Sequence, residues 1–99
     1  MQARRVVVSG IGALTPIGNN LQEYWEGLIN GKSGGAPITL FNAENFKTNF
    51  ACEVKNFNPT DFLDRKEARK LDRFCQFAMV TAAEAIEKSK LDVEAINPD

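Results

Sequence analysis

The chain opens with a continuous apolar run and continues with apolar residues at helical spacing. Val6, Val7 and Val8 form a β-branched run that is typical of a strand covered on both faces, so the sequence predicts a strand over residues 5–9. One helical face follows, with apolar residues at i, i+3, i+4 and i+7, and it predicts a helix over about residues 20–30. The residues of that face are Leu21, Tyr24, Trp25 and Leu28. Asn19 or Asn20 is suited to cap this helix, and Gly31 to end it.

A longer helix is predicted near the end of the chain, from about residue 65 to 88. Asp64 followed by Glu67 has the spacing of a capping box. Apolar residues fall in one arc of this helix at 100° per residue, and its alanines would permit close approach of a neighbouring element. The arc holds Leu71, Phe74, Cys75, Ala78, Met79, Ala82, Ala85 and Ile86, and the alanines are Ala78, Ala82, Ala83 and Ala85.

The segment between these helices is predicted to be mostly loop. Short strands are expected at residues 38–40 and 49–54, and turn chemistry at residues 56–61 places Pro59 in a helical first turn. The order of strand, helix, loop, strand and helix indicates a layered α/β protein. It also indicates an incomplete one, because the opening strand needs neighbours on both sides and few segments are available to supply them.

The composition of the chain argues against several classes of function. The chain has 99 residues, 43% of them hydrophobic, with a formal net charge of -1, so nothing global attracts nucleic acid or anionic lipid. No apolar run is long enough to span a membrane, and we expect a soluble, cytoplasmic protein. There is no histidine, which removes the usual general base and metal ligand near neutral pH. A chain without histidine can still be an enzyme, although fewer catalytic groups are open to it, and we expect no metal and no cofactor in this chain.

The glycine loop after the first predicted strand raises the question of dinucleotide binding. Gly10 and Gly12 begin a G-x-G-x-x-G pattern, but Thr15 stands at the third glycine position and Pro16 follows it. A tight strand exit that needs glycine backbone freedom is the better interpretation.

The cysteines and aromatic residues are interpreted as packing groups. Cys52 lies in a predicted strand beside Glu53, and Cys75 lies on an apolar helical arc, so neither has the surroundings that activate a thiolate. Tyr24 and Trp25 are expected to be core anchors.

The cations of the last predicted helix are unusual. Arg65, Lys66, Arg69, Lys70 and Arg73 fall within about 140° of arc, in the half of the helix where the macrodipole disfavours positive charge. Either they form a solvated face, relieved by nearby carboxylates, or the face binds an anion such as a phosphate or a strip of carboxylates.

Several stretches resemble the condensing enzymes, the β-ketoacyl-acyl-carrier-protein synthases of bacterial fatty-acid synthesis. The opening R-V-V-V-S-G-I-G at residues 5–12, the G-K-S-G at 31–34 and the D-R-K-E-A-R-K-L-D-R-F at 64–74 carry the likeness, which is greatest for the type II synthase. It covers essentially the whole chain, with Ser9 where the family more often has Thr.

This resemblance implies the N-terminal portion of a thiolase-type layered α-β-α-β-α fold, incomplete in this chain. Residues 1–99 would form the N-terminal part of the first thiolase-like half, in an enzyme several-fold longer that acts as a homodimer. The family condenses an acyl-cysteine with malonyl-carrier protein after decarboxylation, helped by two histidines. The cysteine lies beyond this chain, and the chain has no histidine, so no catalytic role is carried over and the chain alone is expected to be inactive.

The resemblance also supplies a partner for the cationic face. The family's docking site for acyl carrier protein, which is acidic and carries phosphopantetheine, matches Arg65, Lys66, Arg69 and Lys70. Two alternatives stay open: a stand-alone carrier-binding module without enzymatic activity, and a fragment of a polyketide-type condensing enzyme. Because the strand at residues 5–9 would have open edges, we expect the isolated chain to fold poorly or aggregate.

Overall fold

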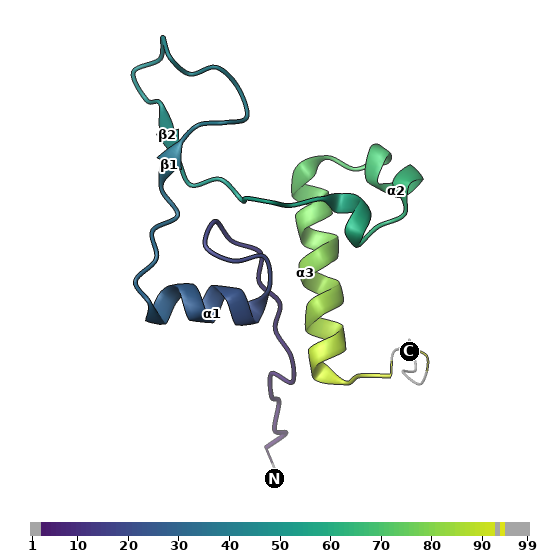
Figure 1. Ribbon diagram of the computed structural model, residues 1–99. Helices are drawn as coiled ribbons and strands as arrows, with labels where there is room; N and C mark the ends of the chain where they lie inside the picture. Colours follow the sequence, from purple (N-terminus) through teal and green to yellow (C-terminus); the bar gives the residue numbers. More distant parts are fainter. Residues whose placement is uncertain (1–2, 93, 95–99) are drawn as a thin grey trace.

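The computed structural model describes residues 3–92 and 94, and it shows an extended molecule built around one long helix. Helix α3 (Arg73–Ser89) forms the central column, with α1 (Leu21–Ile29) to one side and α2 (Arg65–Lys70) beside its N-terminal end (Figure 1). A small antiparallel sheet, β1 (Ala36–Pro37) and β2 (Phe50–Ala51), begins an arm that projects away from the helices. The 3-10 turn η1 (Pro59–Asp61) leads into α2. The coarse α/β expectation is confirmed: the chain combines helices with one small sheet.

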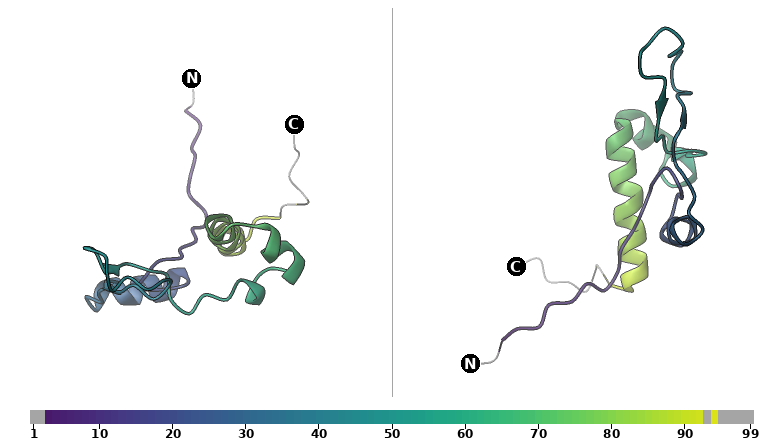
Figure 2. Two further views of the ribbon diagram at one scale, coloured as in Figure 1. Left: turned by 90° about the horizontal axis from the view of Figure 1, so that it is seen from above. Right: turned by 90° about the vertical axis from the view of Figure 1, so that its left-hand side faces the viewer.

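The molecule has little interior. Its Cα radius of gyration is 17.6 Å, against about 13 Å for a compact domain of this length. Among the described residues, the buried apolar side chains are Ala43, Ala68 and Val80. Figure 2 shows the same openness from two further directions, with the N-terminal segment running past α3 and out into solvent. None of the described helices is both long and apolar enough to cross a bilayer.

The predicted strand at residues 5–9 is not formed. The segment is irregular, and Val6 is 91% exposed and Val8 82% exposed. A β-strand is stable only when its N–H and C=O groups pair with a neighbouring strand, and no described segment lies there to pair with it. The β-branched run therefore has the propensity of a central strand without the partners of one.

Helix α1 agrees with its prediction at both ends. The Asn20 side chain accepts a hydrogen bond from the Glu23 N–H at 2.9 Å, and Gly31, with φ of 66°, follows the last turn. Its predicted apolar face is only partly covered, because Trp25 is 61% and Leu28 49% exposed. The expectation that Trp25 anchors a core is therefore wrong within the described chain.

The sheet forms near the predicted places but is shorter. Ala36 pairs with Ala51 and Pro37 with Phe50, so the first strand lies two residues earlier than expected. The second falls within the predicted range of residues 49–54. The predicted turn before α2 is confirmed, with Pro59 opening η1 and the Asn58 side chain capping it.

The long helix predicted over residues 65–88 is broken in two. Leu71 adopts φ −105° and ψ 136°, and Asp72 is also extended, so these two residues separate the end of α2 from the start of α3. The predicted capping box is absent too, because the Asp64 side chain makes no capping hydrogen bond. Leu71 continues the helical apolar pattern, so spacing alone gave no signal of the break.

The face by which α3 packs on the rest of the chain differs from the predicted apolar arc. Phe77, Val80, Thr81 and Glu84 are at least half-buried, whereas Phe74 is 70% and Met79 49% exposed. Of the alanines expected to permit close approach, Ala85 lies at a contact, while Ala78, Ala82 and Ala83 are exposed. The predicted arc is therefore largely an uncovered apolar surface.

Candidate functional site

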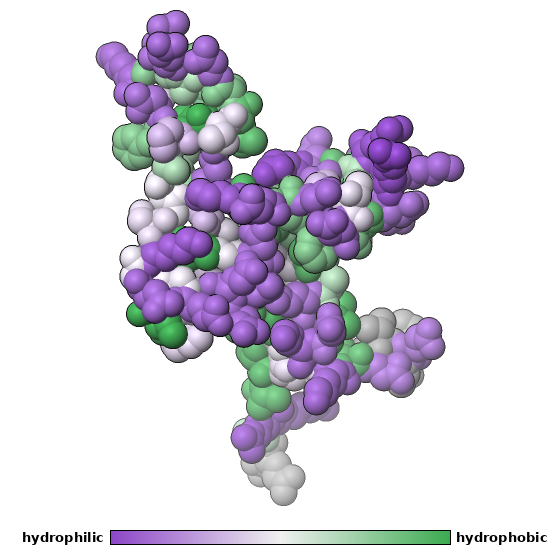
Figure 3. All heavy atoms as spheres, viewed as in Figure 1, coloured by the Kyte–Doolittle hydropathy of each residue, from purple (hydrophilic) through white to green (hydrophobic). Residues whose placement is uncertain are grey.

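The strongest candidate site is a group of four cations on α2, here called the α2 cationic surface: Arg65, Lys66, Arg69 and Lys70. All four side chains are exposed. They occupy about 140° of the short helix, and the buried Ala68 lies on the side turned away from them. Figure 3 shows the resulting hydrophilic projection at the α2 end of the molecule. Four positive charges within six residues, on an element that stands out from the chain, form a surface accessible to an anionic partner.

The break after Lys70 changes the electrostatic argument for this surface. In one continuous helix all four cations would lie in the half that the macrodipole disfavours. In the structure Arg69 and Lys70 lie in the last turn of α2, where the dipole favours positive charge. Only Arg65 and Lys66 remain at the unfavourable end. The case for anion binding therefore depends on charge density and exposure more than on opposition to the dipole.

Arg73 is separated from the other cations and has a packing role. Its Nη2 donates to the Val54 carbonyl oxygen at 3.4 Å, and its guanidinium lies 5.1 Å from the ring centroid of Phe77 and 5.8 Å from that of Phe57. Phe57 and Phe77 meet edge to face at 5.1 Å. Arg73 therefore joins the start of α3 to the segment that precedes η1.

The glycine loop is required for close contact with α3. A Cβ on Gly12 would overlap the Thr81 carbonyl oxygen, and one on Gly10 would overlap the Ala85 carbonyl oxygen. Gly31 is the described glycine with positive φ, so Gly10 and Gly12 provide space for the helix and not a left-handed turn. This explains the two glycines without a nucleotide, although by a different cause than the predicted strand exit.

The cysteines are less enclosed than expected. Cys52 is exposed and Cys75 is half-buried, and both are free thiols. The expectation of two core thiols is therefore wrong for Cys52. The neighbouring Glu53 has a structural role, because its carboxylate accepts hydrogen bonds from the Thr39 N–H at 3.1 Å and from the Thr39 hydroxyl at 2.9 Å. The Thr39 backbone N–H is the main cause that lowers the pKa of Glu53, and the Leu40 N–H and Lys55 add to it.

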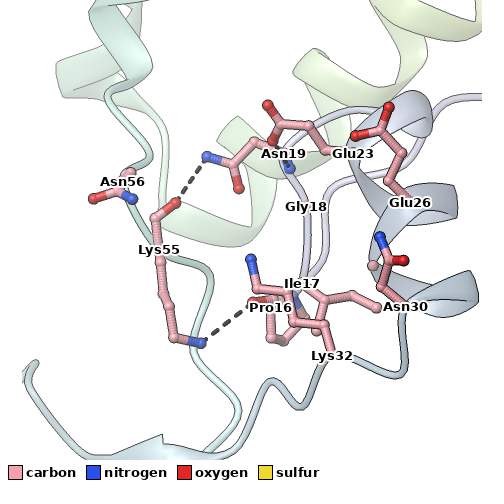
Figure 4. Close-up of a pocket in the computed structure, with 11 residues that line it drawn as sticks. Pro16, Ile17, Gly18, Asn19, Glu23, Glu26, Asn30, Lys32, Lys55 and Asn56 are labelled. Carbon is pink, nitrogen blue, oxygen red and sulfur yellow. Dashed lines mark hydrogen bonds between the residues drawn. The ribbon is translucent and has the colours of Figure 1, made fainter.

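An open cavity of about 510 Å³ lies between the Pro16–Asn19 loop, α1 and the segment after β2 (Figure 4). Lys55 closes one side of it, and its ammonium donates to the carbonyl oxygens of Pro16 at 3.2 Å, Gly34 at 3.0 Å and Glu53 at 3.1 Å. The Asn19 amide donates back to the Lys55 carbonyl oxygen at 2.8 Å. An ammonium has three protons to donate, so Lys55 connects three segments by hydrogen bonds. Sequence reasoning missed this role, because an isolated lysine gives no signal of it.

Glu84 is a second polar residue whose role the sequence did not indicate. Its Oε1 accepts the Ala13 N–H at 2.8 Å, and its Oε2 accepts the Leu21 N–H at 3.0 Å. Leu21 is the first residue of α1, so the Glu84 carboxylate joins the glycine loop, α1 and α3. The Glu84 side chain is half-buried.

Comparison with known proteins agrees with the resemblance in the sequence. Residues 3–99 match the family described as "Beta-ketoacyl synthase, N-terminal domain". The chain is 50% identical over 99 residues to 3-oxoacyl-[acyl-carrier-protein] synthase 2 of Synechocystis sp. (strain PCC 6803), and 46% identical over 97 residues to the protein of that name from Coxiella burnetii. It covers 24% and 23% of these two relatives, so it spans about a quarter of their length.

Solved structures support the same relationship. The ishigamide ketosynthase/chain length factor superposes with a TM-score of 0.84 at 36% identity, over 95% of this chain and 23% of that one. A type II polyketide ketosynthase in complex with its acyl-carrier protein superposes with a TM-score of 0.71 over 94% of this chain and 24% of its own. Its identity is 22%, so this second likeness concerns the fold alone.

Proposed function

The chain belongs to the β-ketoacyl synthase family, and from this premise we propose that it forms the N-terminal part of a β-ketoacyl-acyl-carrier-protein synthase of fatty-acid elongation. Relatives that are 44–50% identical carry the name 3-oxoacyl-[acyl-carrier-protein] synthase 2, which supports this assignment over a polyketide enzyme. Residues 1–99 belong in this proposal to the first half of a thiolase-type layered fold, in a cytoplasmic, homodimeric enzyme.

The proposed reaction of the whole enzyme is a decarboxylative condensation. A cysteine thiolate first takes the acyl group from its carrier. Malonyl-carrier protein then loses carbon dioxide, and the carbanion attacks the acyl-cysteine carbonyl, releasing the thiolate. The family's nucleophilic cysteine and two histidines match no residue here, and this chain contains no histidine at all. Its contribution is therefore scaffold and partner binding.

Uncovered apolar surface supports the scaffold part of the proposal. The exposed side chains include Val6 and Val8 in the N-terminal segment and Phe74, Met79 and Ile86 along α3. Large apolar side chains exposed in this number are typical of a contact with other protein. We propose that the remainder of the enzyme covers it and supplies the strands that the Val6–Val8 run needs.

The α2 cationic surface is proposed to dock acyl carrier protein. The observation that carries this proposal is the exposure of four cations within one six-residue helix, directed away from its buried Ala68. An acidic carrier with a phosphopantetheine arm is complementary to such a surface. Because the charges are exposed, they should act mainly on the rate of encounter and should be screened by salt.

A charge reversal tests the docking proposal. In the enzyme that contains this segment, Lys66→Glu with Arg69→Glu should raise the KM for carrier-linked substrate about five- to thirtyfold, from two reversed exposed charges. The rate with a small acyl thioester that lacks the carrier should stay nearly unchanged. Lys47→Glu with Lys88→Glu reverses two exposed cations elsewhere and should leave both activities as they are. Parallel loss with both substrates would reject docking and make these residues structural.

Two measurements separate the alternatives. The intact mass of the native protein distinguishes a stand-alone carrier-binding module from part of a longer enzyme. Product analysis with acyl- and malonyl-carrier protein distinguishes a fatty-acid enzyme, which makes one β-ketoacyl product per cycle, from a polyketide-type enzyme that extends it repeatedly.

A further inference from the structure

The break between α2 and α3 leaves the orientation of α2 to be fixed by side chains. Leu71 and Asp72 are extended, so the carbonyls at the end of α2 lose the N–H partners that a continuing helix would provide. A short helix joined to its neighbour through two extended residues has several directions open to it. The four cations of α2 form one surface only if that direction is held.

Gln76 supplies further donors at this junction, where the Ala68 carbonyl oxygen also accepts the Leu71 N–H at 3.4 Å. Its side-chain Nε2 donates to the Ala68 carbonyl oxygen at 2.9 Å and to the Leu71 carbonyl oxygen at 3.4 Å. Gln76 lies in the first turn of α3, where its own N–H bonds the Asp72 carbonyl oxygen at 3.0 Å. One half-buried side chain therefore connects the start of α3 to the end of α2.

The Gln76 contact lies at the point where α2 meets the rest of the chain. Ala68 is 5% exposed and is the inward-facing residue of α2, so its carbonyl is held at the point where the helix meets the chain. Arg73, just after the break, holds the start of α3 against Val54 and Phe57. With α3 fixed in this way, the Gln76 amide ties the end of α2 to α3, while α2 also contacts η1.

We infer that Gln76 is a positioning residue for the α2 cationic surface: it does not contact the partner but holds α2 in the orientation that presents the four cations together. This inference rests on the docking function proposed above. A residue of this kind should affect recognition of the carrier and leave the chemistry with carrier-free substrate unchanged. Its effect should also depend on the cations, because orientation matters only while they contribute to docking.

Two substitutions in the full-length enzyme remove the contact in different ways. Gln76→Met keeps the length and removes the donor, whereas Gln76→Asn keeps the donor and removes the reach. Each should raise the KM for acyl-carrier protein about three- to tenfold, the range for loss of one partly buried hydrogen bond, with kcat for a small acyl thioester unchanged. Gln22→Met is the matched control, because the exposed Gln22 side chain donates to Glu26 within α1 and, among the described residues, to no part of α2 or α3.

A double-mutant cycle completes the test. In a Lys66→Glu, Arg69→Glu background, Gln76→Met should produce no further rise in KM, because there is no longer a cationic surface to orient. Should both Gln76 variants keep the wild-type KM while the charge reversal raises it, the positioning role is wrong and docking stands. Should the charge reversal itself have no effect, the docking function fails. Equal, additive losses with both substrates would make Gln76 a merely structural residue.

Discussion

Replacing Glu84 with alanine removes the carboxylate that joins the glycine loop, α1 and α3. Its two oxygens accept the N–H groups of Ala13 at 2.8 Å and of Leu21 at 3.0 Å. The second of these is the first N–H of α1, which has no partner inside the helix. After the substitution both N–H groups must turn to water or stay unpaired.

The size of the effect follows from the number and kind of bonds lost. A hydrogen bond to a charged group contributes about 1.5–3 kcal/mol, and two are lost here. Glu84 is only half-buried, so water replaces part of the interaction, and we expect a local cost of about 2–3 kcal/mol. That corresponds to about a 30- to 150-fold rise in the population of locally opened molecules.

Native-state hydrogen exchange measures this opening directly. In the enzyme that contains the segment, the Ala13 and Leu21 amides should exchange about 30- to 150-fold faster in the Glu84→Ala variant. Glu87→Ala is the control, because Glu87 is exposed and lies three residues further along the same helix. Unchanged protection at both amides in Glu84→Ala would refute the role assigned to this carboxylate. An equal effect of Glu87→Ala would show that helix charge, and not the two bonds, is responsible.

Three further outcomes follow from the contacts described. Gly12→Ala should destabilise the protein by about 1–3 kcal/mol in urea unfolding, because its Cβ would overlap the Thr81 carbonyl oxygen, and a stability equal to wild type would contradict that contact. The lowered pKa of Glu53 implies stabilisation that is complete above the unfolded value of about 4.3 and is lost as pH falls through the folded value. Glu53→Gln should therefore make the free energy of unfolding depend less on pH in that range, and an unaltered pH profile would contradict this. The isolated chain should make no β-ketoacyl product and show no cooperative thermal transition, so turnover above a protein-free control, or sharp melting of a monodisperse monomer, would favour the stand-alone module.

Local signals were sufficient for the elements that local contacts stabilise. Helix α1 and the η1 turn follow from Asn20, Gly31 and Pro59, each of which acts within its own turn. The strand predicted over residues 5–9 is absent because it depends on contacts that are not local. Its Val6–Val8 run has the right propensity, but a strand is completed by distant partners that a local pattern does not contain.

The sequence predicts which cations form the candidate site, but not that they lie on a separate short helix. Arg65, Lys66, Arg69 and Lys70 are evident as a cluster of cations, whereas the break at Leu71 that sets them on a separate helix interrupts a regular apolar spacing without a glycine or proline. The polar residues that hold the structure were missed because their partners are far along the chain. Glu84 bonds residues 63 and 71 positions away, and on a helix such a side chain has the same pattern as a solvated one.

The association rate of acyl carrier protein at two ionic strengths tests the central claim most directly. With the wild-type enzyme the rate should be high at about 0.05 M salt and fall steeply by about 0.3 M, as the charges become screened. With Lys66→Glu and Arg69→Glu it should be slow at both, with little change in the dissociation rate. A wild-type rate that is insensitive to salt, or the same salt dependence in the variant, would contradict docking on α2.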